Sequence, residues 1–357
     1  MRTVHLVVPA GIEDPARPSG GNAYDLRVCR ELTERGRRVV RHDIPGDWPV
    51  PGPGGLTALR SVLAGLAAGS VVLVDGLVGS AAGELLAAEA GRLGIVLLVH
   101  LPLGVGVAPD AALVASELRA VSSAQRVIVT SDWTRGWLLQ HTAADPAQVI
   151  VARPGVDPAP TAVGGTDGGR LLSVGALAPV KGQDRVLAAL NGIRDLEWTW
   201  TCVGSRAVDP AYVERLITEV DRNGLGGRVR LAGPQPPEEL GESYAATDLL
   251  VVGSRHETYG MVVGEALARG IPVVVTPVGG VAEALGTTRT GVPGLVAATD
   301  DAAGLADAIR RWLTDPELRT RLRAAARVRR ATLAPWSSTV DRVESALAVG
   351  STDLGGV

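Results

Sequence analysis

The segment SRHETYGMVVGEALARGIPVVV, residues 254–275, decides the fold and points to a ligand site. It holds two glutamates, Glu257 and Glu265, eight positions apart, and returns through Gly-Ile-Pro to an apolar strand. Eight positions are about two helical turns, so a carboxylate just before a helix and one inside it lie on much the same side. The first helical turn has backbone N–H groups without intrahelical partners, which suit phosphate, and carboxylates accept hydrogen bonds from hydroxyl groups. The segment is therefore expected to bind a ligand that carries both phosphate and sugar hydroxyls.

The composition describes a folded protein large enough for two domains. The chain has 357 residues, of which 46% are hydrophobic and 20% charged, so it can bury sizeable cores and is not disordered. A formal net charge of -3 gives no electrostatic footprint for nucleic acid. No apolar run is long enough to span a bilayer, so stable membrane insertion is not expected, and no secretion signal is evident. With Cys29 and Cys202 as its two cysteines, the protein is expected to be cytoplasmic with reduced thiols.

Apolar runs alternate with helical stretches in two successive series. Runs of Val, Leu and Ile without polar alternation indicate strands buried on both faces, and their repetition with helices indicates doubly wound α/β domains with parallel sheets. The expected strands are 4–8, 39–42, 71–75, 95–100, 126–130 and 149–151, then 171–174, 198–203, 229–231, 249–252, 272–275 and 294–296. The expected helices are 23–35, 56–68, 81–92, 109–121 and 134–141, then 183–190, 210–223, 237–247, 262–269, 305–313, 317–331 and 335–347.

Three further stretches accompany the opening segment: SVGALAPVKGQD at 173–184, TPVGGVAE at 276–283, and residues 291–295 with Asp300. Together these motifs resemble the retaining glycosyltransferases of family 4, with their Glu-x7-Glu signature and GT-B architecture. The resemblance is strong in the second half and weaker in the first. It implies two doubly wound Rossmann-like domains facing across a cleft. The expected parts are an acceptor domain at 1–157, a linker at 158–169, a nucleotide-sugar donor domain at 170–332, and a helix and tail at 333–357 that cross back to the first domain.

The resemblance also implies roles for residues of the second half. Lys181, the one lysine of the sequence, would contact the donor diphosphate, where a compact ammonium is not equivalent to an arginine. Glu257 would orient a hydroxyl of the transferred sugar, and Glu265 would accept hydrogen bonds from the ribose. The remaining donor-binding positions that it implies are Gly175, Gly233, Gln235, Thr258, Tyr259, Gly260, Met261 and Val262.

Two features of the first half extend this resemblance. Gly20, Gly21 and Asn22 form a loop before an expected helix and resemble the Gly-Gly loop of the family, near the donor phosphates. His100 ends an apolar run, where the family places a histidine that points toward the donor sugar. His100, Lys181 and Glu257 are therefore the expected catalytic residues.

The activity that the resemblance implies is transfer, with retention, of a hexose-type sugar from a UDP- or GDP-sugar to a hydroxyl of a soluble small molecule or natural product. No metal, cofactor or nucleic-acid partner is expected. Family members commonly carry an arginine where this chain has Ala176, which gives them a second cation at the diphosphate. Here either Arg206 or Arg255 supplies that cation, or Lys181 and backbone amides are enough to bind the diphosphate. An epimerase or phosphorylase and a non-catalytic nucleotide-sugar-binding protein are alternatives. A nicotinamide-dependent dehydrogenase is a third, disfavoured because the first strand-to-helix turn lacks Gly-x-Gly-x-x-Gly.

Overall fold

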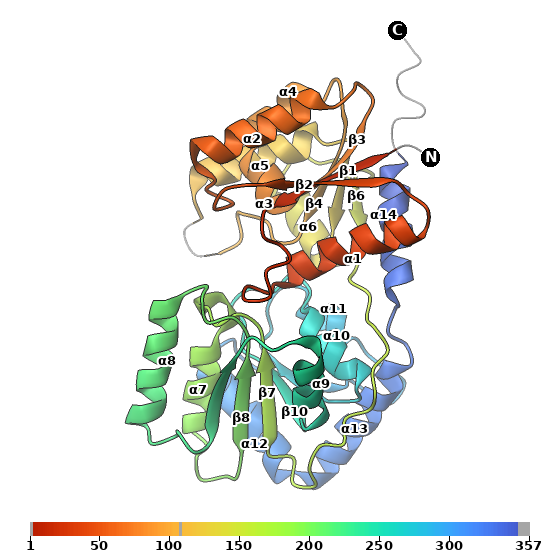
Figure 1. Ribbon diagram of the computed structural model, residues 1–357. Helices are drawn as coiled ribbons and strands as arrows, with labels where there is room; N and C mark the ends of the chain where they lie inside the picture. Colours follow the sequence, from red (N-terminus) through yellow and green to blue (C-terminus); the bar gives the residue numbers. More distant parts are fainter. Residues whose placement is uncertain (1–2, 107–108, 349–357) are drawn as a thin grey trace. The chain divides into compact units, whose positions relative to one another are not determined.

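The computed structural model describes residues 3–106 and 109–348 and divides into two compact units. The first unit comprises the chain up to Glu13, Gly20–Gly155 and the segment from Trp336; the second comprises Asp14–Ser19 and Val156–Pro335. Each unit has one six-stranded sheet whose neighbouring strands run parallel (Figure 1). The prediction of two doubly wound α/β domains is confirmed. Within the described residues, no helix combines the length and the low polarity that crossing a bilayer requires.

The sheet of the first unit has the order β2-β1-β3-β4-β5-β6. Its strands are β1 Val4–Pro9, β2 Val39–Ile44, β3 Val71–Asp75, β4 Gly94–Val99, β5 Arg126–Val129 and β6 Val149–Val151. Its helices are α1 Gly20–Glu34, α2 Gly52–Gly65, α3 Gly76–Ala81, α4 Gly83–Glu89, α5 Ala111–Ser123, α6 Asp132–His141 and α14 Trp336–Leu347. In β3, Val72 and Val74 join the core that α2 to α5 cover, and Leu73, equally buried, points to the opposite face. Burial on both faces explains the uninterrupted apolar runs.

Helices α1 and α14 pack against each other in the first unit. The rings of Tyr24 and Trp336 meet edge to face with centroids 5.6 Å apart, and both side chains are buried. The Thr339 hydroxyl donates to the carbonyl of Arg153 at 2.7 Å, and Arg35 pairs with Glu344 at 2.9 Å. Helix α14 is therefore part of the first unit's core.

The sheet of the second unit has the order β12-β11-β10-β7-β8-β9, the strand order of dinucleotide-binding domains. Its strands are β7 Arg170–Val174, β8 Thr199–Val203, β9 Val229–Gly233, β10 Leu249–Val252, β11 Val273–Val275 and β12 Gly294–Val296. Its helices are α7 Gln183–Asn191, α8 Pro210–Arg222, α9 Pro237–Ala245, α10 Met261–Ala268, α11 Val281–Leu285, α12 Ala302–Thr314 and α13 Pro316–Arg330. Leu171 faces the core with α7, α8 and α12, whereas its neighbour Leu172 faces the core with α9, α10 and α11.

Two expectations about helices are wrong, and one helix was not expected. The helix expected at 81–92 is two short helices, α3 and α4, and α3 begins directly after β3 because the carboxylate of Asp75 accepts from the N–H of Leu77 at 2.8 Å and caps it. Residues 20–22, expected as a loop, form the first turn of α1. The five-residue helix α11 was not predicted, since one turn gives no periodicity to detect.

The strand orders locate one switch point in each sheet, where successive strands depart in opposite directions. In the first unit it lies between β1 and β3, and in the second between β7 and β10. Ligands of doubly wound domains bind at the carboxyl ends of strands at such points. A ligand is therefore expected beside the segments that follow β1 and β3 in the first unit, and beside those that follow β7 and β10 in the second.

Candidate active site

Two segments meet at the switch point of the second unit, one after β7 and one after β10. Gly175 follows β7 with φ 148°, and Lys181 ends the 3-10 turn Pro179–Lys181. The next residue, Gly182, has φ 65°, and a Cβ there would lie 1.9 Å from the carbonyl oxygen of Gly253. Only glycine fits this conformation and this contact, so Gly182 lets the two segments touch backbone to backbone.

This contact brings Lys181 to Glu257, 76 positions later in the chain. The Nζ atom lies 2.7 Å from Oε2, and the Glu257 side chain is 11% exposed against 36% for Lys181. An ammonium has three donors, so Lys181 can keep this partner and still contact an anionic ligand. The predicted residues Lys181 and Glu257 therefore form one group at the edge of the sheet.

The Gly-Gly turn after β11 fixes the backbone of Glu257. Gly280 donates its N–H to the Glu257 carbonyl at 3.0 Å, and the Thr276 hydroxyl donates to the Ser254 carbonyl at 2.7 Å. Gly279 has φ 55°, and a Cβ there would lie 1.7 Å from the same Glu257 oxygen. The two glycines thus form a close-fitting support for the loop that carries the carboxylate.

Helix α10 begins beside this loop. Its N-cap is Gly260, with φ 87°, and among the described residues no side chain caps the helix. The predicted positions Thr258 and Tyr259 precede the cap, and Met261 and Val262 form the first turn. Because the N–H groups of a first turn have no intrahelical partner, this end of α10 can donate to an anion.

The second glutamate of the motif lies in α10 and contacts α9. The Tyr244 hydroxyl donates to Glu265 Oε2 at 2.7 Å, and burial, with the neighbouring Glu265 carboxylate, raises the pKa of Tyr244 well above its usual value. One residue earlier on α9, the Ser243 hydroxyl donates to Gln235 Oε1 at 2.8 Å. Gly233 ends β9 with φ 75°. Helix α9 thus holds both Gln235 and Glu265, but in contacts separate from the Lys181–Glu257 pair.

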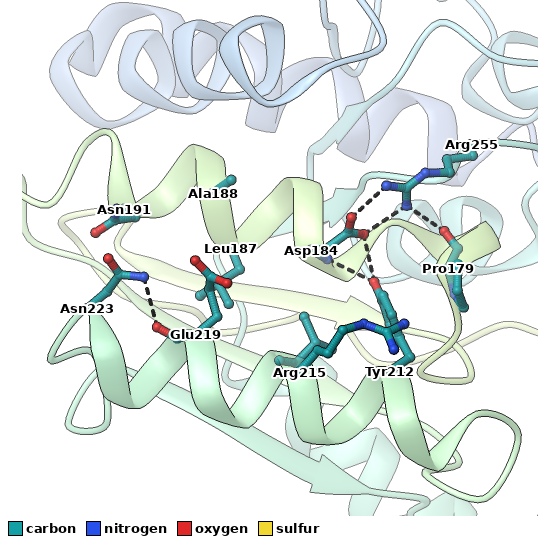
Figure 2. Close-up of a pocket in the computed structure, with 11 residues that line it drawn as sticks. Pro179, Asp184, Leu187, Ala188, Asn191, Tyr212, Arg215, Glu219, Asn223 and Arg255 are labelled. Atoms are coloured by element: carbon teal, nitrogen blue, oxygen red, sulfur yellow. Dashed lines mark hydrogen bonds and ion pairs between the residues drawn. The ribbon is translucent and has the colours of Figure 1, made fainter.

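Arg255 does not lie free to replace the missing motif arginine. Its guanidinium contacts both oxygens of Asp184, at 2.8 and 2.5 Å, and donates to the Pro179 carbonyl at 2.6 Å. Burial opposes the effect, but hydrogen bonds from Arg255 and Tyr212 hold the pKa of Asp184 below its ordinary value. Figure 2 shows this network at one end of a cavity of about 570 Å³ between α7 and α8. The side chain of Arg206, the other candidate, lies beside Gly233: a Cβ added there would be 3.9 Å from its Cδ.

The predicted residues of the first unit form a second group. His100 follows β4, and its Nε2 lies 2.8 Å from Asp25 Oδ1 and 3.5 Å from Asp75 Oδ2. Gly21 backs the ring: a Cβ there would lie 3.3 Å from the imidazole. Burial lowers the pKa of His100, but the two carboxylates more than offset this, and the net shift is upward. Gly20 and Asn22 flank Gly21 in the first turn of α1.

Sequence reasoning missed Asp25 and Asp75. Asp75 ends the apolar strand β3 as His100 follows the apolar strand β4, so its position was a usable signal. Asp25 lies inside a helix and gave none. The ligand-type atoms of these three residues lie within 4.8 Å of one another, the one such grouping of three His, Cys, Asp or Glu in residues 3–106 and 109–348.

Comparisons with known proteins agree with this architecture. The family model described as glycosyl transferases group 1 matches residues 165–329. The chain is 33% identical over 291 residues to D-inositol 3-phosphate glycosyltransferase 1 of Catenulispora acidiphila, covering 76% of this chain and 68% of that protein. Enzymes of the same description from Frankia alni and Kineococcus radiotolerans are covered over only 58% and 60% of their length.

Solved structures match over nearly the whole chain. Sucrose-phosphate synthase of Thermosynechococcus elongatus superposes with a TM-score of 0.80 at 22% identity, covering 97% of this chain and 98% of that one. Anabaena HepE in complex with UDP and glucose gives 0.73 at 18% identity, covering 98% and 100%. These likenesses confirm the GT-B fold. Together with the sequence relatives, they establish that the chain belongs to the group 1 glycosyl transferase family, the family that the motifs predicted.

Proposed function

We propose that the protein is a retaining glycosyltransferase that moves a hexose-type sugar from a nucleoside diphosphate sugar to a hydroxyl of a small soluble acceptor. The observation that carries this proposal is the 2.7 Å contact of Lys181 with Glu257, beside the uncapped start of α10 and at the switch point of the second sheet. A cation, free N–H donors and a carboxylate are there within one small region. These are the groups needed for a diphosphate joined to a sugar.

Each part of the donor has a proposed partner. Lys181 and the N–H groups of Met261 and Val262 bind the diphosphate, and Glu257 orients a hydroxyl of the transferred sugar. Glu265 accepts hydrogen bonds from the ribose, and the Gly233–Gln235 segment contacts the base. In the first unit, His100 hydrogen-bonds a substrate hydroxyl. The second unit is thereby the donor domain, and the first the acceptor domain.

The names of similar proteins favour particular substrates. HepE was solved with UDP-glucose as well as with UDP and glucose, so a UDP-sugar is the first donor to test. The curated relatives are described as acting on D-inositol 3-phosphate. A hydroxyl of a polyol, phosphorylated or not, is therefore the first acceptor class to test for this chain, which we place in the cytoplasm.

The proposed chemistry needs neither a metal nor a dedicated carboxylate base. The acceptor attacks the face from which the diphosphate leaves, and the departing phosphate oxygen takes the acceptor proton. The protein lowers the barrier by holding positive charge, Lys181 and the start of α10, where negative charge develops on the leaving group. With Ala176 at the position of the motif arginine and Arg255 paired with Asp184, Arg206 is the remaining candidate for a second cation.

A ligand panel tests the donor. Thermal unfolding is to be measured with UDP, GDP, ADP, dTDP and NAD, each at a concentration far above its expected dissociation constant. A ligand at 100 times that constant stabilises the fold by about 2.7 kcal/mol, so the correct diphosphate is expected to raise Tm selectively. The anomeric configuration of the product, read by NMR, then tests retention. A shift with NAD alone, or with none of the five, would refute the proposed function.

Replacing Tyr244 with phenylalanine is expected to weaken nucleotide binding through Glu265. The buried hydroxyl donates to a carboxylate, and losing such a bond costs about 1.5–3 kcal/mol. We expect roughly tenfold weaker nucleotide binding by calorimetry. Tyr212→Phe is the matched control, since it removes a hydroxyl bonded to Asp184 and is expected to lower stability without changing nucleotide affinity. Equal affinity losses in the two variants would contradict the ribose role of Glu265.

A further inference from the structure

The buried group of Asp25, Asp75 and His100 in the first unit is not explained by sugar binding alone. Asp25 comes from α1, Asp75 ends β3, and His100 follows β4. The two aspartates are 1% and 3% exposed, whereas the His100 side chain is 18% exposed. A substrate can therefore reach the imidazole, while the two carboxylates contact the buried side of the ring.

The carboxylates act on one nitrogen of the ring. Asp25 and Asp75 approach Nε2 at 2.8 and 3.5 Å. An ionised carboxylate only accepts hydrogen bonds, so beside such a carboxylate the short contact is a hydrogen bond when Nε2 carries a proton. A Cβ added at Gly21 would lie 3.3 Å from Cδ2 and 3.7 Å from Nε2, and the rings of Tyr24 and His100 meet edge to face with centroids 5.2 Å apart. The ring is thus held with Nε2 turned inward.

The other nitrogen has no such partner. Among residues 3–106 and 109–348, no group forms a hydrogen bond with His100 Nδ1. Nδ1 is also not one of the fully buried polar atoms that lack a partner. It is therefore the polar atom of the ring open to solvent. In a neutral imidazole with a proton on Nε2, Nδ1 must be an acceptor. An acceptor at this place suits a hydroxyl group.

Asp75 helps to keep the charge of the group balanced. Its Oδ1 accepts from the N–H of Leu77 at 2.8 Å. Burial, together with the Asp25 carboxylate, raises the pKa of Asp75 well above its usual value. Two buried carboxylates of full charge would repel each other, and a protonated Asp75 relieves this repulsion.

We propose that Asp25 and Asp75 are positioning residues that keep His100 in the Nε2–H form and present Nδ1 to a substrate hydroxyl. This inference rests on the proposed function for the identity of the substrate, but the state of the ring can be measured without any substrate. The logic is that of a carboxylate that fixes the tautomer of a catalytic histidine in hydrolases, where the amide variant produces the wrong tautomer.

The first experiment reads the tautomer directly. Long-range 1H–15N NMR resolves both nitrogens of each of the five histidines, and His100→Gln identifies the His100 signals. On the alkaline side of its titration, native His100 is expected to show a protonated Nε2 and an unprotonated Nδ1. A protonated Nδ1 would overturn the proposal. A change of the Nε2 signal on adding Mg²⁺ or Mn²⁺ would also overturn it, because the three side chains would then bind metal instead of a proton.

The second experiment uses Asp25→Asn, with Asp75→Asn beside it. An amide is a weaker partner for Nε2–H and can itself donate, so the tautomer population is expected to shift toward Nδ1–H. Turnover is expected to fall about 10–100-fold, as for other residues that orient a functional histidine, with KM for the sugar nucleotide nearly unchanged. Asp47→Asn, at an exposed position of the same unit, is the matched control and is expected to change neither.

The two experiments separate the possible failures. An unchanged tautomer and unchanged turnover in folded Asp25→Asn protein would refute the positioning role while leaving glycosyl transfer intact. A native Nε2–H tautomer without any nucleotide-induced Tm shift would refute the proposed function and leave the assignment of the ring in place. If Asp25→Asn does not fold, the native spectrum with Asp75→Asn still decides.

Discussion

Glu257→Ala is expected to lower turnover at least 100-fold and to change the affinity for nucleoside diphosphate only a few-fold. The proposed role of Glu257 is at the transferred sugar, whereas the proposed binding groups for the diphosphate are Lys181 and the start of α10. Removing one preorganised polar group from a reacting centre typically costs about 10²–10³ in turnover. The measurement combines kcat for sugar transfer with calorimetric titration of the diphosphate.

Two companion variants sharpen this test. Glu214→Ala removes an exposed carboxylate of α8 in the same unit and is expected to leave both quantities unchanged. Lys181→Ala is expected to reduce both, since in its proposed role the ammonium contacts the diphosphate in the ground state and in the transition state. If Glu257→Ala reduced affinity and turnover by the same factor, Glu257 would not act at the sugar.

Among glycine-to-alanine substitutions in the second unit, Gly279→Ala is expected to cause the largest loss of stability and activity. A left-handed backbone conformation costs an alanine about 1–2 kcal/mol of conformational free energy. At this position its Cβ would also lie 1.7 Å from the Glu257 carbonyl oxygen. Neither backbone segment can yield without displacing the loop that carries Glu257. The free energy of unfolding is therefore expected to fall by more than the cost of the left-handed backbone alone. Transfer activity is expected to be lost.

The control for this variant isolates the collision. Gly224→Ala has a similar φ of 65° with nothing within 4 Å of the added Cβ, so it is expected to lose only about 1–2 kcal/mol and to keep full activity. Denaturant unfolding and a transfer assay compare the two. Equal losses of stability, with activity kept in Gly279→Ala, would show that the Gly-Gly turn does not support Glu257.

The fold was predictable because its signals are local. Strands such as β10 and β12 have the expected bounds, since apolar runs end where the chain leaves the buried sheet. The error at α3 arose because a helix of six residues follows β3 without a loop. Its start is set by the Asp75 cap, a contact between a side chain and the backbone that periodicity does not reveal.

The site was only partly predictable. The motifs indicated Lys181 and Glu257 separately, and their contact follows from strand order, because β7 and β10 are neighbours in the sheet. The ion pair between Arg255 and Asp184 could not be predicted from the sequence, because it depends on the register of α7. Asp25 was missed because a helical aspartate is usually solvated, and only the fold turns it toward His100.

The place of α14 has a consequence for synthesis. The first unit needs this helix to cover Tyr24 and to bond the carbonyl of Arg153, yet the ribosome makes it after the whole second unit. Domains commonly fold as they emerge, the N-terminal one first. Here the order of completion is reversed: the six strands of the second sheet are all made before the first unit receives α14. A nascent chain stalled before Trp336 would therefore expose apolar surface on the part made earliest, which is where a chaperone would be needed.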